Sequence, residues 1–226
     1  NRFCRLSLEQ LERRDVPSTA TFAVASAIVH SSESFADTIT LDYTRFLNRA
    51  PDAAGFSFLL RQMQSGVAPE VIEAEFVSSP EYVRNHGGPT GGWVFGLYND
   101  LLGRLPSNSE VAFWDDELAL GRSTFQIGLA FSTSVERDAI VVSDMYVTML
   151  GRAPDAVGLN FFVSALRSGS NRAAVESTII GSTEYFVDHG INDSTFVLGV
   201  YQNVLLRTPS NTEVNFWVQE LHNLGG

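Results

Sequence analysis

An internal duplication constrains this chain more than any other feature of its sequence. Shifted by 103 residues, the sequence matches itself without a gap from Tyr43 to Trp114, which correspond to Tyr146 and Trp217. The segment "RAPDAAG" at 49–55 returns as "RAPDAVG" at 152–158, and "RLPSNSEVAFW" returns as "RTPSNTEVNFW". Because neighbouring copies of a repeat bury a shared core, the sequence predicts a repeat fold.

A second, weaker echo divides each long repeat. A Tyr-x5-Arg-x-Pro frame starts at Tyr43, Tyr98, Tyr146 and Tyr201, at spacings of 55, 48 and 55 residues. We therefore expect two long repeats, each made of two unlike half-repeats, A and B. The expected divisions are a leader at 1–30, a first repeat at 31–138 (halves 31–88 and 89–138) and a second at 139–226 (halves 139–190 and 191–226).

We expect the last half-repeat to be incomplete. The sequence stops at Gly226, and no counterpart of residues 124–138 follows the second B half-repeat. A terminal repeat without its neighbour leaves an apolar face uncovered. We therefore expect partner helices, or another copy of the chain, to cover that face.

Each half-repeat has helical periodicity. Phe35, Ile39, Tyr43 and Leu47 share one helical face, and Phe56, Leu59, Leu60 and Met63 do the same before Ser65-Gly66. No segment alternates as a half-buried strand does. The fold class predicted is all-α.

The corners between helices repeat four times and use two capping devices. The A corners predict an aspartate N-cap after a proline that ends the preceding helix, and the B corners predict a serine–glutamate capping box. We interpret both as structural, with the arginine meeting helix carbonyls or the capping carboxylate. The corner residues are Arg49, Pro51, Asp52, Gly55, Arg104, Pro106, Ser107, Glu110, Arg152, Pro154, Asp155, Gly158, Arg207, Pro209, Ser210 and Glu213.

Few other residues suggest chemistry. Trp93, Trp114 and Trp217 are candidate exposed aromatics for binding, although aromatics at helical spacing are usually core residues. His86 and His189 each precede a glycine at an expected helix end, and the acidic run 115–117 is expected to form a solvated helix face rather than a calcium loop. No catalytic residue, metal ligand or cofactor is predicted.

Charge and composition exclude several classes of protein. The net charge is −11, and all 15 basic residues are arginine, so lysine chemistry is excluded. An acidic chain is a poor partner for nucleic acid. No run approaches the length of a transmembrane helix.

The N-terminus allows two interpretations. Its basic residues, the apolar run "TFAVASAIV" and the triplet Ala25-Ser26-Ala27 outline a secretory signal, although Glu9, Glu12 and Asp15 interrupt the basic part. The alternative is a short amphipathic helix ending before Pro17. "LSLEQLERRDVPS" also resembles a leader found in large bacterial surface and secreted proteins, which favours export.

The corner frame resembles a bacterial family named domain of unknown function 4214, in tandem copies over about residues 35–226. The resemblance rests on Tyr146, Leu150, Gly151, Arg152, Pro154, Asp155, Gly158, Phe161, Phe162, Ser168, Gly169, Glu184 and Tyr185, with matching positions from Tyr43. A looser likeness connects the "LGRxPD" corner to phycobilisome linker domains. The resemblance implies an all-helical module of secreted or surface proteins and no catalytic residues.

From these patterns we expect a non-catalytic structural or interaction module of an exported or cell-surface bacterial protein, whose partner is a protein or another copy. Two alternatives remain: a module that binds surface glycans, and an enzyme with a site between the long repeats.

Overall fold

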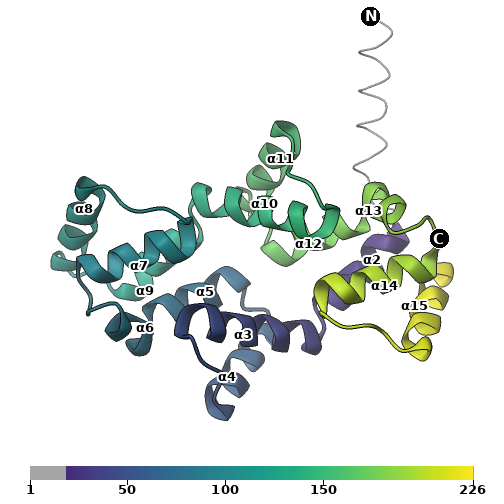
Figure 1. Cartoon of the computed structure of the whole chain (residues 1–226), viewed down its shortest axis with the longest axis horizontal. Coiled ribbons are helices and arrows are strands. Elements are labelled where there is room, and N and C mark those ends of the chain that lie inside the picture. The colour runs from purple at the N-terminus through teal and green to yellow at the C-terminus, as the bar shows by residue number, and fades with distance from the viewer. Residues whose placement is uncertain (1–18, 226) are drawn as a thin grey trace, which may run out of the picture. The chain divides into compact units, whose positions relative to one another are not determined.

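The computed structural model describes residues 19–225, and these form helices α2 to α15 with no strand among them (Figure 1). The all-α prediction is confirmed. The chain divides into two compact units: residues 35–141 form one, which we call the central unit, and residues 19–34 with 142–225 form the other, the split unit. The boundaries between the units fall inside α3 and α10.

The central unit has one core. Its helices are α3 (Ser32–Leu47, from Phe35 on), α4 (Ala53–Gln64), α5 (Pro69–Ser78), α6 (Pro80–Asn85), α7 (Gly91–Leu102), α8 (Asn108–Ala119), α9 (Thr124–Ser132) and the start of α10 (Val135–Leu150). Ile39, Ile72, Trp93, Leu97 and Ile127 are fully buried in that core. α9 packs mainly along α5.

The split unit repeats this arrangement from two distant segments. Its helices are α2 (Thr19–Val29), the end of α10, α11 (Ala156–Arg167), α12 (Arg172–Gly181), α13 (Thr183–Asp188), α14 (Asp193–Val204) and α15 (Asn211–Asn223). α2, purple in Figure 1, packs along α12 and also contacts α14 and α15.

The structure therefore corrects the expectation of an uncovered last half-repeat. α2 takes the place in the split unit that α9 takes in the central unit, and residues 19–34 are the counterpart, 103 residues earlier, of residues 122–137. Thr21-Phe22 corresponds to Thr124-Phe125, and Glu33 to Glu136. The expected leader at 1–30 is thus divided: Thr19–Val29 is a core helix, with Ala25 completely buried, whereas the amphipathic helix predicted before Pro17 lies outside the described residues.

The helix ends follow the local chemistry of the sequence. Ser79 caps α6 with Pro80 at the first helical position, and α4 stops at Ser65 before the left-handed Gly66. Within residues 19–225, no helix combines the length and apolar character that crossing a membrane requires.

Candidate functional site: the four helix corners

Each corner ends its incoming helix with one residue in the left-handed region. These residues are Asn48, Gly103, Gly151 and Leu206, with φ of 51°, 64°, 63° and 52°. In three corners the N–H of the next residue, arginine, donates to the carbonyl of the tyrosine six positions earlier. This closure satisfies a helix carbonyl and turns the chain sharply.

The arginine of each corner lies over that same tyrosine ring. The guanidinium carbon is 4.7–5.2 Å from the ring centroid in all four copies, which is the range of a cation–π contact. The pairs are Arg49 on Tyr43, Arg104 on Tyr98, Arg152 on Tyr146 and Arg207 on Tyr201.

Each guanidinium is also bound by a glutamate that lies on another helix. Arg49 donates to both carboxylate oxygens of Glu81 at 2.7 Å, and Arg152 binds Glu184 in the same two-pronged way. In these pairs, and in Arg104 with Glu136, the glutamate follows the arginine by 32 residues. A planar guanidinium and a carboxylate match in this geometry, so the pair fixes orientation as well as distance.

The fourth corner has no residue 32 positions further on within this sequence, and its glutamate comes from the other end. Arg207 donates to both oxygens of Glu33, at 3.0 Å for Nη2, and Glu33 is the counterpart of Glu136. The same polar contact therefore joins the first turn of α3 to the last corner.

The A corners cap the outgoing helix with aspartate. Asp52 accepts from the N–H of Gly55 at 2.9 Å, and Asp155 accepts from the N–H groups of Val157 and Gly158. The glycine is required, because a Cβ at residue 55 would lie 2.1 Å from the Tyr43 hydroxyl oxygen.

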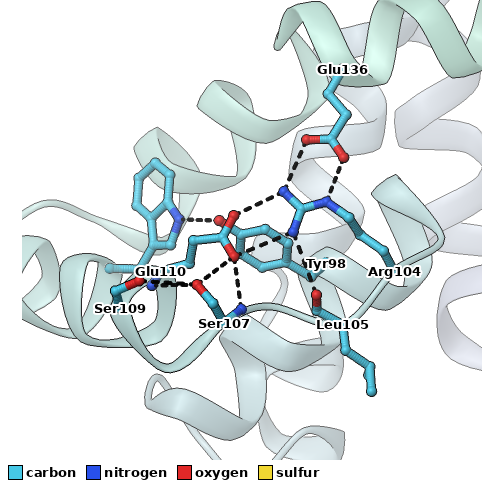
Figure 2. A network of polar contacts seen from close by, with 8 residues as sticks. Tyr98, Arg104, Leu105, Ser107, Ser109, Glu110 and Glu136 are labelled. Carbon is cyan, nitrogen blue, oxygen red and sulfur yellow. Dashed lines mark hydrogen bonds and ion pairs between the residues drawn. The ribbon is translucent and has the colours of Figure 1, made fainter.

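The B corners use serine and glutamate. In Figure 2, Glu110 lies between Ser107 and Arg104, and the guanidinium reaches both Glu110 and Glu136. Ser210 and Glu213 repeat the capping box. The tyrosine hydroxyl that faces glycine in the A corners accepts here from a tryptophan: Trp114 Nε1 donates to Tyr98 at 3.2 Å.

The charges in the B corners stabilise one another. The hydrogen bonds from Arg104, together with those from Ser107, lower the pKa of Glu110 to about 2. Arg207 and Ser210 lower the pKa of Glu213 to about 2 in the same way. The corresponding arginine pKa values rise, chiefly through the hydrogen bonds to Glu136 and Glu33.

The predicted caps and capping boxes are confirmed. The partners predicted for the arginines make weaker contacts than partners that were not predicted. Arg49 approaches Asp52 at 3.4 Å and Arg152 reaches the carbonyl of Ala153, whereas the two-pronged partner is the distant glutamate. The 32-residue spacing was present in the sequence and could have revealed three of these partners. The fourth requires noticing that Glu33 corresponds to Glu136.

The candidate binding tryptophans do not form an exposed aromatic site. As a candidate exposed binding residue Trp93 is wrong: it is fully buried, as aromatics at helical spacing usually are, and its Nε1 donates to the carbonyl of Val77. Trp114 and Trp217 are half-buried against the cores, and their Nε1 groups are bound to Tyr98 and Tyr201. A large ring with a single polar atom fits an interior where that atom has a partner.

The histidines serve the packing of helix ends, as the sequence suggests. His189 stacks on Tyr185 and His86 lies tilted over Tyr82, with ring centroids 3.9 and 4.1 Å apart, and each ring Nδ1 is hydrogen-bonded to the carbonyl of that tyrosine. The acidic run 115–117 lies within α8. The described residues contain no group of three or more candidate metal ligands.

What the corners do expose is a repeated phenylalanine. Phe58, Phe113, Phe161 and Phe216 occupy the same position on α4, α8, α11 and α15, and each is more than half exposed. Phe58 lines an open groove of about 400 Å³ beside the first corner, with Tyr43, Arg49 and Arg84. Phe161 and Val157 line a shallow hollow on α11.

Comparison with known families agrees with this repeated architecture. The family model "Domain of unknown function (DUF4214)" matches residues 73–141, 137–189 and 176–225, which together are more than half of the chain. The chain belongs to this family and contains it in tandem copies. Neither a curated protein nor a solved structure matches.

Proposed function

We propose that this chain is a non-catalytic structural module that builds assemblies by binding further copies of itself through the exposed phenylalanines of the corner helices. The observation that carries the proposal is their recurrence: four helices expose the same large apolar side chain. At interfaces between proteins, aromatic side chains contribute much of the binding energy.

The corner chemistry supports a structural role over an enzymatic one. The corner arginines, glutamates and capping residues hold one another, so their charge is used in fixing the helices. Acid–base or nucleophilic catalysis needs a polar group directed at a substrate, whereas those of the corners are directed at one another.

Sedimentation velocity over a wide concentration range tests this proposal. We expect the wild-type chain to associate as concentration rises, and a variant with all four phenylalanines changed to serine to require a much higher concentration to associate. Leu41→Ser with Leu120→Ser is the matched control, because these leucines are exposed outside the four positions. A wild-type chain that stays monomeric throughout, or a serine variant that associates equally well, would contradict the proposal.

Glycan binding is the alternative interaction. Sugar sites combine a stacking ring with free polar groups, whereas the exposed rings here are phenylalanines and the tryptophan N–H groups are already bonded. These features favour protein as the partner. Reproducible glycan-array binding that is lost on changing Trp114 and Trp217 would support the alternative.

We also propose an exported or cell-surface location, on the resemblance of the N-terminal segment to bacterial leaders. Fractionation of cells that express the full-length gene tests this point, and a protein retained in the cytoplasm would contradict it.

A further inference from the structure

The split unit is completed by a helix that joins it from a distant part of the chain. Val24 and Ile28 of α2 are fully buried in its core, as Ile127 and Phe131 of α9 are in the central unit. The residues of the central unit, 35–141, separate α2 in sequence from every other helix of its core. When α2 packs into this core, it closes a loop of more than 100 residues. No short connection therefore links α2 to the helices that it packs against.

Specific contacts hold α2 against the other helices of the split unit. Thr21 donates to the carbonyl of Gly181 at 2.7 Å, the counterpart of the contact from Thr124 to Ser78. α2 approaches so closely that a Cβ at residue 181 would lie 2.8 Å from the Phe22 Cα. The ion pair of Glu33 with Arg207 fixes the adjoining turn of α3.

Away from these contacts, α2 is at best a marginal helix. It has 11 residues without a charge, and isolated helices of that length are marginal in water. Residues 30 and 31 are the only link between α2 and α3. A released α2 would therefore carry an apolar face that fits the groove on α12, α14 and α15 of any copy of the chain.

We propose that α2 is an exchangeable donor helix: residues 19–34 of one copy fill the groove of the split unit of a second copy. This goes beyond the proposed function, because it joins copies through a buried groove rather than through the exposed phenylalanines. The contacts in the exchanged form are the same as those within one chain, so concentration decides between the two forms.

Two full-length variants test the exchange. In Ile28→Asp the donor is damaged and the groove is intact; in Gly181→Ala the donor is intact and the groove clashes with α2. Neither variant can seat its own helix. At a concentration below that at which the wild-type chain associates through its phenylalanines, we expect an equimolar mixture to form a one-to-one complex by size-exclusion chromatography with light scattering, while each variant alone remains monomeric. A mixture that elutes as two monomers would overturn the proposal.

A second measurement guards against misfolding of the variants. A fluorescent peptide of residues 19–34 is titrated into the full-length Ile28→Asp chain, with a peptide that carries aspartate at positions 24 and 28 as control. We expect saturable binding of the first peptide alone; no binding would overturn the proposal, because it would show that the groove does not accept α2 from outside.

The two proposals fail separately. The mixing experiment is repeated in chains that also carry serine at the four exposed phenylalanines, and we expect the complex to persist. Loss of the complex in that background alone would overturn helix exchange and leave the phenylalanine surface as the contact between copies.

Discussion

At the scale of single residues, the two units differ in a buried ion pair. In the central unit Arg137 forms a buried ion pair with Glu73, and Tyr82 donates to Asp100 at 2.8 Å. In the split unit the positions of Arg137 and Asp100 hold Ser34 and Asn203, but the position of Glu73 keeps a glutamate, Glu176. Burial raises the pKa of Glu176 to about 7.

This difference predicts a pH effect on stability. The pKa of Glu176 is higher in the folded chain than in the unfolded one. The contribution of this carboxyl group to the free energy of unfolding is therefore fully present below pH 4.5 and is lost as pH rises to about 7. We expect Glu176→Gln to gain stability relative to wild type across this window, by up to about 3 kcal/mol. Urea unfolding of both chains at a series of pH values measures the effect, and parallel pH curves would contradict it.

At the scale of helices and corners, the same turn is built with two capping devices around one constant contact. Asp52 caps one corner and the Ser107–Glu110 box caps the next, yet arginine on tyrosine and a two-pronged glutamate occur in all four. The interchange of caps indicates that the physical requirement is a capped turn between two helices, not one particular capping residue.

We therefore expect Arg104→Gln to destabilise the chain, because it removes the partner of both Glu110 and Glu136. We expect Tm to fall by roughly 2–4 °C at neutral pH, as the loss of a small, exposed network of ion pairs would cause. The wild-type contribution depends on the low pKa of Glu110, so the difference should shrink as pH falls from 4.5 to about 2.

Arg122→Gln is the control for this measurement. Arg122 pairs with Glu117 in the same unit but outside the corners. If thermal unfolding shows an equal fall in Tm for the two substitutions, the corner network contributes no more to stability than an ion pair outside the corners.

At the scale of the whole molecule, one unit is continuous in sequence and the other is not. Ile28 lies in the core of the unit that contains residues 142–225, and Phe131 holds the equivalent place in the unit of residues 35–141. Damage at residue 28 should therefore act on the distant C-terminal half.

Hydrogen exchange tests this organisation. Burying a charge in either core costs roughly 3 kcal/mol or more, so we expect Ile28→Asp to speed amide exchange in α12 and α14 while α5 and α7 stay protected. Phe131→Asp is the matched control and should show the reverse. Faster exchange of α5 and α7 in Ile28→Asp would contradict the division into units.

The helical class, the four corners and their caps follow from the sequence because they depend on residues within a few turns of one another, and the duplication follows from comparing the sequence with itself. Only the tertiary structure decided that Trp93 is buried, that the corner arginines bind distant glutamates, and that residues 19–34 complete the last half-repeat. These contacts are set by packing between segments far apart in the chain. Local propensity carries no information about which of several apolar helices fills a groove; the closeness of α2 to Gly181 and the bond of Arg207 to Glu33 provide it.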